Sequence, residues 1–267
     1  MIQIENLSMI FSHGTPNENI ALKNIDLNVS GGDFITIIGS NGAGKSTLYN
    51  VIAGSRIPSS GRIFIENGNG RRDITRDAEY KRARYIGRIF QNPLLGTAGK
   101  MSLADNMMIC HKKGYKSLKI SLNSKMKEQF REQLRVLGMG LENRLGDNVD
   151  LFSGGQRQAL TLLMTVMSRP SLLLLDEHTA ALDPHNAELI MNLTLKFAAE
   201  YKLTVMMITH NMNQALQYGN RLLMMDSGEI ILDIDSAEKN KLTSADIVRR
   251  FKDIKKQELA NDEMLLS

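Results

Sequence analysis

The sequence predicts an α/β protein whose N-terminal part is antiparallel β structure and whose core carries an inserted helical subdomain. Three observations support this prediction. β-Branched runs fill the first third of the chain, and one of them, "FITIIGS", leads directly into a glycine-rich loop and a helix-compatible segment. The run "SLLLLDE" is apolar up to its final acids, which is typical of a strand buried in a parallel sheet. Between these two runs the sequence changes to a helical pattern.

The strands expected in the first third are "IQIENLSMI", "LKNIDLNV", "FITIIGS" and "RIFIEN". The segment "KSTLYNVIAG" follows the third of these strands. It is expected to be a helix that ends at Gly54, because glycine readily adopts the left-handed conformation that closes a helix.

The middle of the chain, residues 92–150, is rich in Met and Lys and contains no good strand. Its apolar residues recur at the spacing of one helix face. These residues are Leu122, Met126, Phe130, Leu134 and Leu137. The pattern predicts a helical subdomain inserted into the α/β core.

Mixed α/β patterning returns after Leu151. Asp183 and Pro184 are expected to begin a helix as its N-cap and first residue. The segment "LTVMMITH" is the next expected strand, and "NRLLMMDSGEIILDI" is an expected hairpin that turns at Ser227 and Gly228. The tail starts as a capped helix near Thr243 and is expected to fray toward its polar end.

The composition and the apolar pattern argue against a membrane-spanning or secreted protein. The 267 residues are 42% hydrophobic and 23% charged, as in ordinary soluble globular proteins. The longest near-apolar run, residues 159–167, is far shorter than the ~20 residues of a membrane-spanning helix. The first residues do not resemble a signal peptide, and the single Cys110 fits a reducing compartment. We therefore expect the protein to stay in the cytoplasm.

The net charge of +4 is unevenly distributed, since six lysines and no acid lie between Lys112 and Lys127. A solvated helix face is the favoured interpretation of this segment. A surface near anionic lipid headgroups is the alternative. Nucleic acid is not an expected partner, because Tyr115 is the only aromatic residue among these lysines.

The segment "GSNGAGKST" matches the phosphate-binding pattern G-x-x-x-x-G-K-[ST] between an expected strand and an expected helix. Its glycines allow backbone N–H groups to face phosphate oxygens at the helix N-terminus. Lys45 should reach the β- and γ-phosphates, and Ser46 should bind Mg²⁺. The residues expected to bind the nucleotide here are Gly39, Ser40, Asn41, Gly42, Ala43, Gly44, Lys45, Ser46 and Thr47.

The acids of "LLLLDE" supply the second half of a nucleotide site. Asp176, at the end of a buried strand, is expected to hold the metal, and Glu177 is expected to polarise the attacking water. Guanine specificity has no support, because the nearest string to a guanine-reading motif, "NKLT" at Asn240, lacks the required acid.

A second glycine-rich anion cradle, "FSGGQRQ" from Phe152, closely resembles the signature of ABC-type ATPases. Other motifs fall into the order of that family. Gln91 resembles the glutamine-loop residue that senses metal and γ-phosphate, and His210 resembles the switch histidine. Phe11 resembles the aromatic residue that stacks on adenine, although Phe11 alone also fits a strand core and His210 alone also fits a helix cap. Ala181, Leu182 and Asp183 resemble the D-loop.

The resemblance spans the chain from Phe11 to about Asp226 and implies a P-loop NTPase core of ABC type. It implies ATP and Mg²⁺ as cofactors, with Glu177, His210 and Gln91 as catalytic residues. It divides the chain into an ATPase domain at residues 1–240, with the helical subdomain at about 92–155, and a helical tail at 241–267. The residues expected to bind Mg²⁺ are Ser46, Gln91 and Asp176.

In this family two domains stack head to tail, and each ATP lies between one subunit's phosphate loop and the other's signature. The resemblance therefore implies that the second cradle binds the partner's nucleotide, through Ser153, Gly154, Gly155, Gln156 and Asp183. Helix N-termini attract anions, which agrees with this role.

The sequence departs from the family pattern at two positions. His178 stands where the residue after the catalytic glutamate is commonly proline, and we expect either a neutral replacement or an effect on rate or pH response. Phe152 stands in the usual leucine position of the signature and keeps an apolar anchor there.

The resemblance further implies an ATPase subunit of a small-solute transporter, peripheral on the inner face of the cell membrane. Its expected partners are an integral-membrane permease, a second ATPase subunit (a homodimer) and an extracytoplasmic substrate-binding protein. An importer, for amino acids, is the favoured type. The alternative is a soluble accessory ATPase of iron–sulfur cluster assembly. The residues expected to contact the permease are Leu94, Leu95 and Met101.

Overall fold

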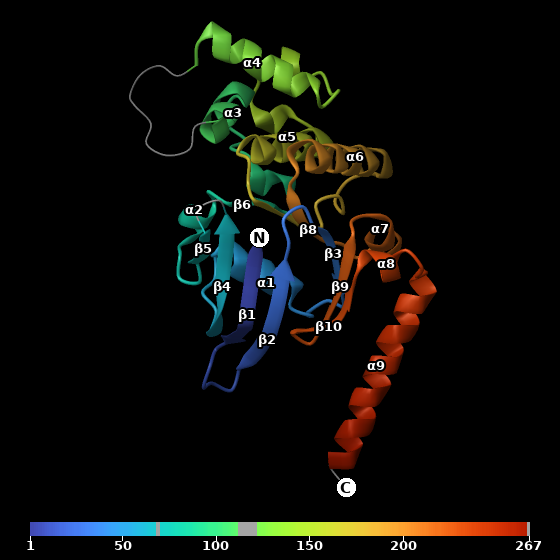
Figure 1. Cartoon of the computed structure of the whole chain (residues 1–267). Coiled ribbons are helices and arrows are strands. Elements are labelled where there is room, and N and C mark those ends of the chain that lie inside the picture. Colours follow the sequence, from blue (N-terminus) through green and yellow to red (C-terminus); the bar gives the residue numbers. More distant parts are fainter. Residues whose placement is uncertain (68–69, 112–121, 266–267) are drawn as a thin grey trace.

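The computed structural model describes residues 1–67, 70–111 and 122–265 and contains two sheets (Figure 1). The smaller sheet is antiparallel, in the order β2-β1-β4-β5. Its strands are β1 (Ile2–Phe11), β2 (Asn19–Val29), β4 (Ser60–Asn67) and β5 (Gly70–Asp73). The sequence predicted its first three strands; β5, with four exposed residues, has no apolar pattern to predict it.

The larger sheet has the order β10-β9-β3-β8-β7-β6. Its strands run parallel except β10, which pairs antiparallel with β9. The strands are β3 (Phe34–Gly39), β6 (Ile86–Ile89), β7 (Leu172–Asp176), β8 (Thr204–Ile208), β9 (Arg221–Asp226) and β10 (Glu229–Ile234). The predicted α/β class is therefore confirmed.

Helices cover both faces of the larger sheet or extend from its ends. They are α1 (Lys45–Ala53), α2 (Glu79–Arg82), α3 (Leu103–His111), α4 (Ser124–Arg135), α5 (Gly154–Met167), α6 (Pro184–Tyr201), α7 (Met212–Gln217), α8 (Ser236–Lys239) and α9 (Ser244–Leu265). Short 3₁₀ turns lie at Pro93–Gly96, Leu141–Asn143 and Val149–Leu151.

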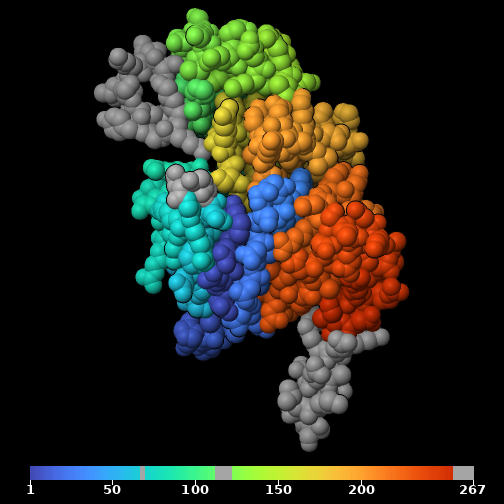
Figure 2. All heavy atoms as spheres, viewed as in Figure 1, coloured from blue at the N-terminus to red at the C-terminus, as the bar shows by residue number. Residues whose placement is uncertain are grey.

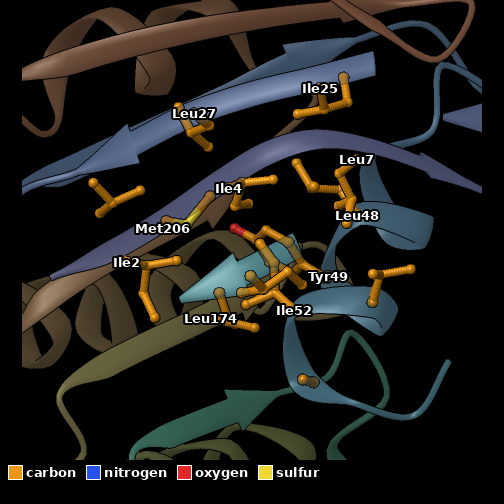
Figure 3. Close-up of a cluster of buried hydrophobic side chains, with 14 of the residues drawn as sticks. Ile2, Ile4, Leu7, Ile25, Leu27, Leu48, Tyr49, Ile52, Leu174 and Met206 are labelled. Atoms are coloured by element: carbon orange, nitrogen blue, oxygen red, sulfur yellow. The ribbon is translucent and has the colours of Figure 1, made fainter. Parts of the chain in front are cut away.

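The two faces of the central strands belong to different cores. Leu172 and Leu174 of β7 pack with α1 and the antiparallel sheet, whereas Leu173 and Leu175 pack with the helices on the other face. Figure 3 shows the first of these cores, where Tyr49 of α1 lies among apolar side chains of β1 and β2. Burial on both faces explains why this strand reads as a continuous apolar run.

The second core joins α3, α4, α5 and α6 to the larger sheet. All five apolar residues of the predicted face pack in or against this core, but only Met126, Phe130 and Leu134 lie on α4, because the helix begins after Leu122 and ends before Leu137. Figure 2 shows the segment of α4 at one end of the molecule, in green, with α5, in yellow, between it and the rest of the chain. Among the described residues, no helix is long and apolar enough to cross a membrane.

Local turns follow the sequence signals. Gly54 ends α1 with φ 86°, and Asp183 caps α6 through a hydrogen bond from the Asn186 N–H to its side chain. Ser227 and Gly228 turn from β9 to β10 with φ of 48° and 85°. These expected turns are confirmed.

Two expectations for surface segments have different outcomes. The tail is helical as expected: α9 runs from Ser244 to Leu265. Four of the six clustered lysines lie outside the described residues, and the other two, Lys125 and Lys127, are exposed on α4. The exposed pair fits a solvated helix face.

Lys239, at the end of α8, is 2% exposed. Its ammonium donates hydrogen bonds to the carbonyl oxygens of Tyr218 and Gly219 and lies 3.4 Å from Thr36 Oγ1. Lys239 thereby ties the C-terminal segment to the end of α7 and to β3. Burial lowers the pKa of Lys239 to about 8.

We predict that Lys239 makes the free energy of unfolding rise between pH 8 and pH 10.5. In this window the folded chain has released the Lys239 proton, whereas the unfolded chain, with the ordinary pKa of 10.5, still binds it, so raising the pH favours folding. The Lys239→Met variant lacks this contribution. Urea denaturation of both proteins across the window tests it, and equal slopes with pH would contradict it.

Candidate nucleotide-binding and hydrolytic site

The glycine-rich loop joins the end of β3 to the start of α1. Gly39 adopts φ 151°, and a Cβ atom there would lie 2.1 Å from the carbonyl oxygen of Met225 on β9. Only glycine can pass this close to the neighbouring strand. The amide of Gly228 donates a hydrogen bond of 3.2 Å to the Ala43 carbonyl, so the β9–β10 turn supports the loop from the same side.

Helix α1 begins without a side-chain cap, at Gly44 with φ 97°. By contrast, α5, α6 and α7 begin with capping side chains from Ser153, Asp183 and Asn211. The first backbone N–H groups of a helix need an acceptor. At α1 they border the hollow described below, which fits a bound phosphate chain.

Lys45 is buried at the base of this loop. Its Nζ donates hydrogen bonds of 2.8 Å to the carbonyl oxygens of both Gly39 and Ser40. Burial lowers the pKa of Lys45, although the charges of Glu177 and Asp176 act in the opposite direction. The ammonium is therefore bound to the loop and lies within the electrostatic influence of two carboxylates.

A hollow of about 280 Å³ opens above the loop. It brings together four separate parts of the sequence that were predicted to form one site: Phe11, the loop from Asn41 to Thr47, Glu177 and His210. Two further residues, Asn19 and Ala21, line the hollow and were not predicted from the sequence. They carry no motif, and the pairing of Asn19 with Phe11 across the β1–β2 hairpin brings them here.

Glu177 and His210 are in direct contact, through Glu177 Oε1 and His210 Nε2. The Glu177 backbone has φ 47°, an uncommon left-handed conformation for a non-glycine residue. Its N–H donates a hydrogen bond of 3.2 Å to the Ile208 carbonyl on β8. A carboxylate paired with an imidazole beside a phosphate cradle can accept a proton from water and orient it.

Asp176 lies at the end of β7, and its side chain is 14% exposed. The Ser46 hydroxyl and the Asp176 carboxylate offer hard oxygen ligands, which suit Mg²⁺. Among the described residues no group of three His, Cys, Asp or Glu side chains could hold a metal. This donor set fits Mg²⁺ bound jointly by a few protein oxygens and phosphate, rather than a cage made by protein alone.

Gln91 stands apart from this arrangement. It is exposed just after β6 and does not belong to the residues that line the hollow. Its expected role toward the metal stays a prediction.

The second cradle lies at the start of α5, outside the hollow. Ser153 and Gln156 form a capping box, in which Ser153 Oγ accepts a bond from the Gln156 N–H and Gln156 Oε1 accepts one from the Ser153 N–H. Ser153 and Gly154 are exposed. Gly155 is buried, and a Cβ there would lie 2.7 Å from Asn186 of α6. The second cradle is therefore a helix N-terminus exposed on the surface of the chain, at a different place from the first cradle.

His178 follows Glu177 but is 2% exposed. Its Nε2 lies 3.2 Å from Thr194 Oγ1 on α6, and its carbonyl accepts a 2.7 Å hydrogen bond from the Gln158 side chain. Burial lowers the pKa of His178 to about 4. These contacts anchor the segment after Glu177 to α5 and α6.

Comparisons with known proteins agree with this geometry. A sequence profile described as "ABC transporter" matches residues 22–180. The chain is 41% identical to a tyrosine transport ATP-binding protein of Clostridioides difficile over 94% of this chain and 98% of that protein. It is 32% identical to the methionine import ATP-binding protein MetN 2 of Enterococcus faecalis, over 99% of this chain and 75% of that protein.

Solved structures show the same similarity. The dimeric post-hydrolysis state of the ATP-binding cassette MJ0796, bound to ADP and phosphate, has a TM-score of 0.72 and 27% identity, covering 88% of this chain and 99% of that one. A nucleotide-free ATP-binding cassette from an ABC transporter has a TM-score of 0.75 and 28% identity, covering 94% and 98%.

We predict that Gly39→Ala abolishes ATP binding and lowers the free energy of unfolding by about 3 to 5 kcal/mol, because the new Cβ displaces β9. Gly14→Ala is the matched control, since Gly14 also has positive φ (74°) but has nothing within 4 Å of the added atom. That control should cost only about 1 kcal/mol. Equilibrium denaturation and ATP titration measure both effects, and equal behaviour of the two variants would refute the close approach as the cause.

Proposed function

The chain belongs to the ABC transporter family, whose ATP hydrolysis is coupled to transport, and we propose that it is the ATPase subunit of an importer for amino acids. It binds ATP through the loop that begins at Gly39. The observation that carries the proposal is the hollow that places Glu177 and His210 beside that loop.

The relatives support the importer assignment. One is named for tyrosine transport and another for methionine import, and the chain matches the first over 98% of its length. Amino acids are therefore the proposed class of solute. The alternative, an accessory ATPase of iron–sulfur cluster assembly, is not favoured, because the relatives compared above are named as transport proteins.

The proposed reaction is in-line attack of water on the γ-phosphate of ATP. Mg²⁺, held by Ser46 and Asp176 with the phosphates, would neutralise charge on the phosphate oxygens. Glu177 orients the water and accepts its proton, and Lys45 contributes a fixed positive charge to the developing transition state. His210, already in contact with Glu177, is placed to reach the γ-phosphate.

We further propose a head-to-tail homodimer as the working unit. A cradle made by Ser153 and Gly154 lies exposed at a helix N-terminus and outside the hollow of its own chain. In the proposed dimer, a phosphate bound in the partner's hollow lies at the N-terminus of α5 and serves as the anion for that helix end. The structural relative MJ0796, itself described as a dimer with ADP and phosphate, supports this arrangement.

The proposed site for the permease is a groove of about 480 Å³ between β6, α2, α3 and α5. Its rim includes Gly96 of the 3₁₀ turn that exposes Leu94 and Leu95, at 56% and 65%. Met101 is 40% exposed. Exposed large apolar side chains beside a groove are typical of a surface that a partner covers. The protein would then lie on the inner face of the membrane, with an extracytoplasmic substrate-binding protein as the third component.

We predict that Glu177→Gln lowers ATP turnover at least ~100-fold while ATP binding persists, because the amide cannot take the proton from water. The bound ATP should then hold the chains together as a dimer. Steady-state turnover and size-exclusion chromatography with ATP measure these effects. Normal turnover in this variant would refute the role of Glu177.

We predict that Leu95→Asp prevents recovery of a polytopic membrane partner when the tagged chain is isolated from native membranes in mild detergent. A charge at a contact with an apolar helix of the permease remains unpaired on docking. Ile20→Asp is the matched control, since Ile20 is also exposed (45%) but lies on β2. Equal recovery with both variants would place the contact elsewhere, and recovery of cluster-assembly proteins without a permease would favour the alternative function.

A further inference from the structure

Arg88 is a half-buried cation between the two proposed sites. It lies on β6, and its side chain is 12% exposed. One guanidinium nitrogen, Nη1, donates a 2.7 Å hydrogen bond to Asn50 Oδ1 on α1. The other, Nη2, lies 3.3 Å from Asp176 Oδ2 at the end of β7. The guanidinium also stacks over the Phe90 ring, 4.6 Å from its centre.

These contacts fix the orientation of the guanidinium group. Arg88 Nε is buried and has no hydrogen-bond partner among the described residues, so the two terminal nitrogens set its position. A planar fork can reach two acceptors at once, which a lysine ammonium on its flexible stem does less precisely. The Asp176 carboxylate is thereby held through one of its oxygens, Oδ2, and the other oxygen remains for a metal.

The same residue belongs to the docking groove. Arg88 is among the residues that line it, with Thr161 and Thr165 of α5 on another wall. Its strand, β6, is the edge strand of the larger sheet. Asn50, on its other side, belongs to the helix that starts at the phosphate loop. Arg88 therefore lies on the strand that forms the groove wall. From there its side chain contacts both the helix that follows the phosphate loop and the carboxylate proposed to bind the metal.

We propose that Arg88 is a positioning residue that orients Asp176 for Mg²⁺ and links the metal carboxylate to the wall of the permease groove. This inference rests on the proposed function, since it takes Asp176 as the metal ligand and the groove as the docking site. Partners that orient a metal ligand commonly affect metal affinity without touching the metal.

The first test compares Mg²⁺ affinity in the presence of AMP-PNP for the full-length wild-type chain and Arg88→Met. We expect Mg²⁺ affinity to fall about tenfold, while AMP-PNP affinity in EDTA stays within about twofold. Arg88→Lys should remain weakened, because one ammonium cannot serve Asn50 and Asp176 in the same geometry. Asn50→Leu should weaken Mg²⁺ binding without adding to the Arg88→Met effect, as expected for residues that act through one contact. Unchanged or tighter Mg²⁺ binding in Arg88→Met would overturn the proposal.

The second test measures the link to the groove. The single cysteine of the chain, Cys110, lines the groove, so an environment-sensitive fluorophore attached there reports on the groove wall. With AMP-PNP bound, addition of Mg²⁺ should change the fluorescence of the labelled wild type and of Arg84→Met, a control that removes the same charge from the same groove. Arg88→Met should lack that change at saturating Mg²⁺. A missing signal in the wild type, or an equal signal in Arg88→Met, would overturn the link.

An Asp176→Asn variant separates this inference from the proposed function. If it retains wild-type Mg²⁺ affinity, the metal site itself is wrong. If it loses Mg²⁺ binding while Arg88→Met keeps it, the metal site stands and only the role of Arg88 is refuted.

Discussion

The close approach of β3 and β9 at Gly39 is the constraint on which the site depends. There is no room for a side chain between Gly39 and the Met225 carbonyl. Because glycine has none, the chain can pass close to β9 and turn tightly into α1. The first turn of that helix then starts without a cap and leaves its N–H groups for phosphate. Glu177 and His210 follow the neighbouring strands β7 and β8, so the parallel sheet delivers them to the same edge. Ligands commonly bind at the carboxyl ends of strands in such sheets.

The second cradle has a different structural origin. It stands at the start of α5, whose body packs in the helical core, and α6 contacts it through Asn186 beside Gly155. The described chain therefore carries two glycine-containing helix starts of different kinds: α1, over the sheet, has no side-chain cap, and α5, on the helical part, is capped by Ser153. A single triphosphate cannot occupy both at once within this chain, because the second lies outside the hollow that holds the first. The proposed pairing of two chains would give each helix end a phosphate ligand.

Sequence patterns predicted the features that depend on local chemistry. The phosphate loop, the buried strand before Asp176, the turn at Ser227 and Gly228, and the helical face of Phe130 and Leu134 each leave a pattern in consecutive residues. Contacts across the sheet leave none. The bridge from Arg88 to Asn50 and Asp176 joins three elements, and Asn19 and Ala21 reach the hollow only through strand pairing. The burial of His178 against Thr194 likewise depends on how α6 packs.

If each ATP is bound by two chains, as proposed, two inactive variants with defects in different cradles should complement each other. One variant, Lys45→Met, has a defective phosphate loop, and the other, Ser153→Arg, has a defective signature. A mixed dimer contains one intact composite site. The Ser153→Arg chain supplies its intact phosphate loop, and the Lys45→Met chain supplies its intact signature. ATP hydrolysis should therefore reappear on mixing, although neither variant is active alone. No hydrolysis in the mixture, with both variants folded, would contradict it.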